Sequence, residues 1–286
     1  MMKPTQRTVQ CLSPSGLHRI AYTEWGAPDN PRVLVCVHGL TRNGRDFDAL
    51  ADALSAHYRV VCPDIVGRGL SAHLRDPAGY AMPQYVADMV TLIARLGVDS
   101  VHWLGTSMGG LIGLALAAQD GSPIRRLVLN DVGPELAVEA LRRIGDYVGA
   151  DPTWISEDEA VAYVRAISPG FGPLTDAQWR YLTETSIARR PDGRWGFRYD
   201  PRIGEAYRAA FADQERIDLW PLYERIACPT LVIRGAESDL LARTTWQAMA
   251  ERGPRAQLAE FPGVGHAPMF QSEDQIGVVR DFLLHS

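Results

Sequence analysis

The chain has 286 residues and a formal net charge of −5, and 46% of its residues are hydrophobic and 22% charged. This composition supports a sizeable core and excludes a wholly disordered chain. The arginine pairs Arg142-Arg143 and Arg189-Arg190 are isolated, so nothing indicates nucleic-acid binding. No apolar run approaches the length of a membrane span, and residues 1–10 lack the apolar region of a secretory signal.

The four cysteines are far apart in the sequence, and no two of them form a C-x-x-C pair. Cys36 and Cys62 fall inside apolar runs that we predict to be strands, where a free thiol behaves as a small apolar side chain. We therefore expect a reduced, cytoplasmic protein without a metal–cysteine site.

Apolar runs with β propensity alternate with helix-type segments along most of the chain. The predicted strands are residues 7–11, 18–25, 33–37, 59–62, 101–104, 127–130, 230–234 and 257–261. The predicted helices are residues 45–54, 82–96, 108–118, 244–251 and 273–284. This alternation predicts an α/β fold with a mostly parallel central sheet of about eight strands and helices on both faces.

Residues 134–221 interrupt this pattern with helix-like pieces and Pro/Gly-rich turns. They contain four of the seven tryptophans, namely Trp154, Trp179, Trp195 and Trp220. Because the α/β pattern resumes at Pro229, we predict a core domain of residues 1–133 and 222–286 with a mostly helical cap inserted at 134–221. An independent second domain is the alternative. The tryptophans could line a pocket, although anchoring the cap to the core is the interpretation we favour, and we assign no substrate-binding side chain in the cap.

Gly105-Thr106-Ser107-Met108-Gly109 lies where a predicted strand meets a predicted helix. This is the setting in which a G-x-S-x-G pattern forms a nucleophile elbow. A tight turn there projects the hydroxyl of Ser107 away from the backbone. Strand and helix can approach so closely only if their side chains are small, and Gly105, Gly109 and Gly110 meet that need. Ser107 is therefore the candidate nucleophile.

Three other polar segments also follow predicted strands, and ligands in parallel α/β sheets bind at the carboxyl ends of strands. His38-Gly39-Leu40 follows residues 33–37. Asp239 closes the turn Gly235-Ala236-Glu237-Ser238-Asp239 after residues 230–234, and His266 follows residues 257–261. Their order along the chain is a candidate oxyanion loop, then Ser, Asp and His.

This arrangement resembles the α/β-hydrolase family, whose triad has the order Ser, Asp, His. The resemblance covers roughly residues 17–133 and 222–285. It implies that Ser107 is the nucleophile and His266 the general base, with Asp239 orienting it. It also implies an oxyanion hole formed by the backbone N–H groups of Leu40 and Met108, a structural role for His38, and chemistry that requires neither a metal nor an organic cofactor.

The triad acid has alternatives in this chain. Asp131 follows the strand after the elbow, where some relatives carry their acid, and Glu237 lies in the same turn as Asp239. The family's acid turn often has one residue fewer, and that spacing would put Ser238 at the acid position. Because serine cannot serve as the carboxylate, we expect a turn one residue longer that ends at Asp239.

A serine nucleophile excludes the usual identification as a haloalkane dehalogenase or a soluble epoxide hydrolase. The Thr-Ser-Met-Gly-Gly form is widespread among esterases, lactonases and thioesterases, so we predict a carboxylic-ester hydrolase acting on a small ester with an apolar part. The alternatives are a C–C bond hydrolase of the meta-cleavage-product type, a lactonase or thioesterase with the same triad, and a non-catalytic ligand-binding protein of this fold. The sequence leaves the substrate and the oligomeric state open.

Overall fold

A computed structural model describes residues 3–212 and 214–285 and contains an eight-stranded sheet with the order β1-β2-β4-β3-β5-β6-β12-β13. Its strands are β1 (Thr5–Ser13), β2 (Gly16–Trp25), β3 (Val33–Val37), β4 (Arg59–Pro63), β5 (Val101–Thr106), β6 (Ile124–Asn130), β12 (Thr230–Gly235) and β13 (Gln257–Phe261). Each predicted strand lies within one of them. From β4 onward all neighbours are parallel, while β1 and β2 are antiparallel to each other and β2 is antiparallel to β4. The predicted α/β fold is confirmed.

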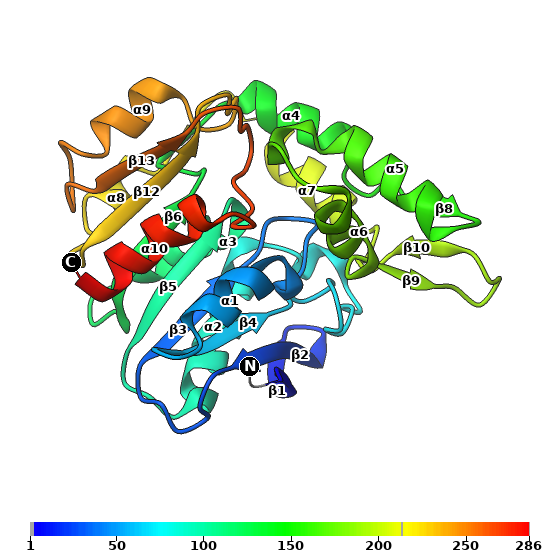
Figure 1. Cartoon of the computed structure of the whole chain (residues 1–286), viewed down its shortest axis with the longest axis horizontal. Coiled ribbons are helices and arrows are strands. Elements are labelled where there is room, and N and C mark those ends of the chain that lie inside the picture. Colours follow the sequence, from blue (N-terminus) through cyan, green and yellow to red (C-terminus); the bar gives the residue numbers. More distant parts are fainter. Residues whose placement is uncertain (1–2, 213, 286) are drawn as a thin grey trace.

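Helices cover both faces of this sheet (Figure 1). They are α1 (Asp48–Leu54), α2 (Met82–Leu96), α3 (Met108–Ala117), α8 (Trp220–Tyr223), α9 (Arg243–Ala248) and α10 (Glu273–His285). Along β3, Val33, Val35 and Val37 pack into the cluster that includes α2 and α3, whereas Leu34 and Cys36 pack into the cluster that includes α1 and α10. This alternation explains why β3 is an uninterrupted apolar run.

The helix predicted at 82–96 has the observed bounds of α2, and those predicted at 108–118 and 273–284 differ from α3 and α10 by one residue. The helix predicted at 244–251 is observed as Arg243–Ala248, and the one predicted at 45–54 begins later. The first turn of the helix expected at 45–54 is a 3₁₀ helix, η1 (Gly44–Phe47), which Asn43 caps by accepting a hydrogen bond from the backbone N–H of Arg45. A further 3₁₀ turn, η2 (Pro77–Gly79), precedes α2.

The chain between β6 and β12 forms a separate layer at one end of the sheet (Figure 1). Its elements are β7 (Glu135–Leu136), α4 (Val138–Tyr147), β8 (Thr153–Trp154), α5 (Glu157–Ile167), η3 (Pro169–Phe171), α6 (Asp176–Glu184), β9 (Ile187–Arg189), β10 (Trp195–Phe197), α7 (Ile203–Phe211) and β11 (Ile217–Asp218). Helices predominate, as expected. The small sheet β8-β10-β9 was not predicted, because strands of two or three residues carry no readable periodicity.

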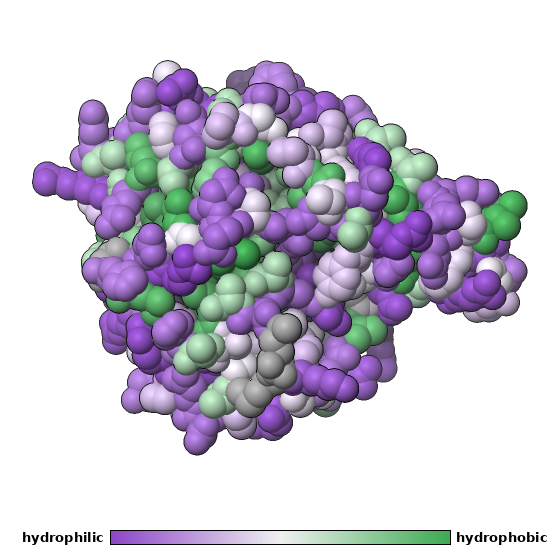
Figure 2. Space-filling view, in the orientation of Figure 1, coloured by the Kyte–Doolittle hydropathy of each residue, from purple (hydrophilic) through white to green (hydrophobic). Residues whose placement is uncertain are grey.

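Most of the face drawn in Figure 2 is hydrophilic, with hydrophobic groups scattered over it. A hydrophobic spot lies at the projecting end where Figure 1 draws β8 and β10, and Ile155, directly after β8, has 74% of its surface exposed. Within residues 3–212 and 214–285, no helix combines the length and the apolar character that crossing a membrane requires.

Candidate active site

The turn between β5 and α3 holds Ser107 in a conformation that few side chains adopt, with φ of +52° and ψ of −116°. Glycines on either side permit it. A Cβ on Gly105 would lie 2.2 Å from the carbonyl carbon of Gly109, and one on Gly109 would lie 2.0 Å from the carbonyl oxygen of Val37. The strand and helix therefore meet at a distance that only glycine allows, as the elbow pattern predicted.

His266 lies on the loop after β13 and contacts the serine. Its Nε2 is 3.0 Å from Oγ of Ser107, and its Nδ1 is 2.7 Å from Oδ2 of Asp131. With Nδ1 protonated, the ring donates to the carboxylate and accepts from the hydroxyl. This geometry matches a nucleophile, a base and an orienting acid.

Asp131 follows β6 and is fully buried, with φ of +54°. Three groups donate to its carboxylate. The backbone N–H of Gly235 is 2.9 Å from Oδ1, and the hydroxyl of Ser238 (2.6 Å) and the ring of His266 (2.7 Å) both contact Oδ2. Since β6 lies between β5 and β12 in the sheet, its end reaches both the serine and the turn after β12.

The expectation that Asp239 orients His266 is wrong. Asp239 forms an ion pair with Arg143 of α4, and its side chain is 48% exposed. The turn after β12 is not lengthened: the N–H of Ser238 bonds the carbonyl of Gly235 at 2.9 Å, and the Ser238 side chain points inward at Asp131. Asp239 comes one residue later and faces the other way, so the neighbouring strand supplies the carboxylate.

The candidate oxyanion loop lies beside the nucleophile, since a Cβ on Gly39 would be 3.8 Å from Cβ of Ser107. Within the part of the chain that the structure describes, the backbone N–H groups of Leu40 and Met108 donate to no other protein atom. They remain available to a developing oxyanion, which supports the predicted roles.

His38 shapes this loop and does not contact the substrate side of it. It is fully buried; Nδ1 donates to the carbonyl of Gly39 at 2.6 Å, and Nε2 accepts from the N–H of Ile65 at 2.9 Å. Burial lowers the pKa of His38 to about 3, so the ring is neutral. The structural role expected for this residue fits these contacts.

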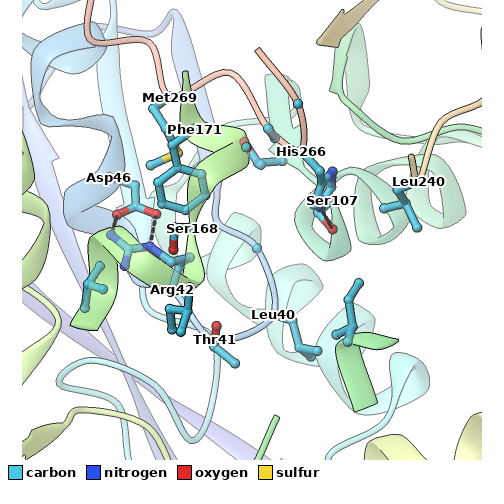
Figure 3. A pocket seen from close by; sticks show the side chains of 18 of the residues that line it. Leu40, Thr41, Arg42, Asp46, Ser107, Ser168, Phe171, Leu240, His266 and Met269 are labelled. Carbon is cyan, nitrogen blue, oxygen red and sulfur yellow. Dashed lines mark hydrogen bonds and ion pairs between the residues drawn. The ribbon is translucent and has the colours of Figure 1, made fainter. Parts of the chain in front are cut away.

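Ser107 and His266 open into a pocket of about 540 Å³ (Figure 3). Residues from the segment between β6 and β12 form much of its wall, and the aromatic ones are Tyr147, Tyr163, Phe171, Phe197 and Tyr199. Burial raises the pKa of Tyr199 to about 12, so this phenol is neutral at physiological pH. The pocket suits a mostly apolar molecule with a few polar groups.

The four tryptophans of this segment are not among the residues that line the pocket. Trp154 packs edge-on against Phe197 at 5.0 Å, Trp179 stacks on Phe171 at 6.0 Å, and Trp220 lies in the main core cluster. Anchoring of the segment to the core is therefore seen for Trp220, whereas Trp154 and Trp179 pack against residues of the segment itself. The aromatic side chains in the pocket wall are tyrosines and phenylalanines.

Cys11, His18 and Asp88 form a buried cluster whose potential ligand atoms lie within 4.8 Å of one another. His18 and Cys11 face each other across the β1–β2 hairpin, and Nε2 of His18 is 3.0 Å from the Asp88 carboxylate on α2. Burial raises the pKa of Cys11 to about 12, which disfavours the thiolate that a metal would bind. We interpret the cluster as a polar link between the hairpin and α2.

Comparison with known proteins agrees with this architecture. A family model described as "alpha/beta hydrolase fold" matches residues 32–273. The chain belongs to the α/β hydrolase fold family. It is 53% identical to the 3-hydroxybutyrate-oligomer hydrolase of Cupriavidus necator, over 96% of each chain. Members of this family with solved structures include an α/β hydrolase from Novosphingobium aromaticivorans, with 36% identity, a TM-score of 0.88 and 99% of each chain covered.

A solved structure from Rickettsia typhi is also similar, with 31% identity, a TM-score of 0.91 and 100% of each chain covered. These similarities extend over the whole length of this α/β hydrolase, including the segment between β6 and β12. Together with the matched family, they identify the chain as a hydrolase of carboxylic esters.

Proposed function

We propose that Ser107, His266 and Asp131 form the catalytic triad of this esterase. Nε2 of His266 removes the proton from Oγ of Ser107 as the oxygen attacks the ester carbonyl. Asp131 holds the ring with Nε2 unprotonated and stabilises the imidazolium that forms. The contacts of 3.0 and 2.7 Å support this assignment.

The reaction then follows from the same groups. The tetrahedral oxyanion accepts hydrogen bonds from the backbone N–H groups of Leu40 and Met108. As the tetrahedral intermediate collapses, His266 gives its proton to the leaving oxygen. The alcohol departs, and the acyl group stays bound to Ser107. Water, activated by His266, releases the acid and restores the serine.

For the substrate, we propose linear oligomers of 3-hydroxybutyrate. The relative from Cupriavidus necator is named for this activity and covers 96% of the chain. A pocket of about 540 Å³ with an aromatic wall is of the size that takes a small organic ligand, roughly 300–1,000 Å³. Such an oligomer is a small ester with apolar methyl branches and thus fits the expected substrate class.

We further propose that residues 134–221 act as a cap that selects this substrate, because they supply the aromatic wall over Ser107. A cytoplasmic location belongs to the same proposal and is supported by four free cysteines, three of them buried.

The test is a panel of substrates for the purified protein: 3-hydroxybutyrate dimer and trimer, aryl esters, a lactone and a ring-fission diketone. The proposal expects the trimer to have the highest kcat/KM and Ser107→Ala to lose turnover on every substrate. Preference for the diketone, or an Ser107→Ala variant retaining more than a few per cent of kcat, would overturn it.

A further inference from the structure

The pocket wall carries two arginines with different surroundings. Arg42 is nearly enclosed: its side chain is 13% exposed, and its guanidinium donates twice to the Asp46 carboxylate and once to the carbonyl of Leu182. Figure 3 shows this pair at one side of the pocket. Arg42 is thus occupied as a link between the oxyanion loop and the segment above it.

Arg143 is the more exposed of the two arginines. It extends from α4 into the same pocket and is 57% exposed, and its Nη1 contacts the carboxylate of Asp239, which also lines the pocket. Among the described residues, Asp239 is the one ion-pair partner of this guanidinium. Because a guanidinium carries five N–H donors, Arg143 has donors left for a second carboxylate.

The proposed substrate supplies such a group. An oligomer of a hydroxyacid is neutral along its length and ends in one free carboxylate and one hydroxyl. Resting on the proposed function, we infer that Arg143 binds the terminal carboxylate of the oligomer and so makes the enzyme selective for free acids over neutral esters of equal length.

The ion pair with Asp239 prepares Arg143 for this role. It holds a long, flexible side chain at the pocket, which reduces the conformational entropy lost on binding. Arg143 comes from the cap and Asp239 from the turn after β12, so the ion pair joins the cap to the core within the pocket lining. With its carboxyl end anchored, the oligomer presents a fixed ester bond to Ser107, and the hydroxyacid piece held at Arg143 leaves as the alcohol.

The experiment compares two trimers of 3-hydroxybutyrate, one with a free carboxylate and one capped as a primary amide. Arg143→Gln should lower kcat/KM for the acid about 10- to 100-fold, mainly through KM, because a hydrogen-bonded charge pair is lost. The amide-capped trimer should change less than twofold. Arg143→Lys should retain part of the preference, since it keeps the charge without the fork of donors.

Arg142→Gln is the matched control. Arg142 is the neighbouring exposed residue of α4, bonds the carbonyl of Gln214 and does not line the pocket. It should leave both substrates unchanged. If Arg143→Gln lowers both trimers equally, or neither, then the pair merely joins α4 to the core and the inference is wrong. If the unaltered protein cleaves aryl esters but neither trimer, the proposed substrate is wrong and the inference is overturned with it.

Discussion

At the scale of single residues, Asp131 is the most constrained member of the site. Its φ of +54° is unusual for a residue other than glycine, and three donors fix its carboxylate. Ser238, one of those donors, occupies the position where the family's usual spacing would put the acid. In the proposed triad, Asp131 with its hydrogen bond from Ser238 takes the place of a single aspartate after β12.

Replacing each of the two candidate acids by asparagine in turn shows which one orients His266. Asp131→Asn should lower kcat about 10⁴-fold, because the amide no longer stabilises the imidazolium or its tautomer. Asp239→Asn should leave kcat for an uncharged aryl ester within about threefold, since this carboxylate meets Arg143 and not His266. Steady-state kinetics with that ester, and circular dichroism to check folding, make the comparison. A larger loss for Asp239→Asn than for Asp131→Asn would reverse the assignment.

The buried ring of His38 makes the stability sensitive to acid. Burial lowers its pKa from 6.5 to about 3. Between these pH values the unfolded chain therefore binds a proton that the native state does not bind. This contribution is present above pH 6.5 and is lost as the pH falls toward 3, with a slope of up to about 1.4 kcal/mol per pH unit. Urea unfolding at pH 7, 6 and 5 should show a shallower decline for His38→Gln than for the unaltered protein.

His57→Gln is the control for that series, because His57 is exposed. It should decline with pH as the unaltered protein does. An unchanged slope in His38→Gln would mean that other groups cause the acid sensitivity.

At the scale of elements, α3 approaches the ends of β5 and β3 so closely that only glycine fits at Gly105 and Gly109, and the Gly109 contact is with the backbone of Val37 in β3. Gly109→Ala would drive a methyl group against backbone that cannot give way and should lower the free energy of unfolding by about 3 kcal/mol. Gly277→Ala is the matched case in α10, where the nearest atom, Nη2 of Arg280, is 3.6 Å away. It should raise the stability by about 0.5–1 kcal/mol. Equal effects in thermal or urea unfolding would contradict the close approach.

The sequence was sufficient for the main sheet, because β3 is an uninterrupted apolar run, β5 and β12 are mostly apolar, and glycine-containing turns follow all three. It also indicated Ser107 and His266, each of which follows a predicted strand in a recognisable turn, and Oγ and Nε2 of these residues lie 3.0 Å apart. It failed at the acid, because two aspartates follow adjacent strands and only the packing of β6 beside β12 reveals which one reaches His266. The short strands β8 to β10 carry too few residues for a pattern.

At the scale of the whole molecule, the inserted layer is tied directly to the loops that carry the chemistry. The carbonyl of Gly170 accepts from the N–H of Gly265 at 2.8 Å, next to His266. Asn43 donates to the carbonyl of Thr185 at 3.1 Å, next to the oxyanion loop. The core therefore carries the proposed triad of Ser107, His266 and Asp131, while the layer above forms much of the pocket wall around them.

The central claim is that 3-hydroxybutyrate oligomers acylate Ser107. Acid quenching of the protein within milliseconds of mixing with trimer, followed by peptide mass spectrometry, tests it most directly. The account predicts a hydroxybutyryl adduct on the peptide that contains Ser107, and no adduct in Ser107→Ala. Turnover of the trimer with no adduct on this serine, or with the adduct on another residue, would contradict it.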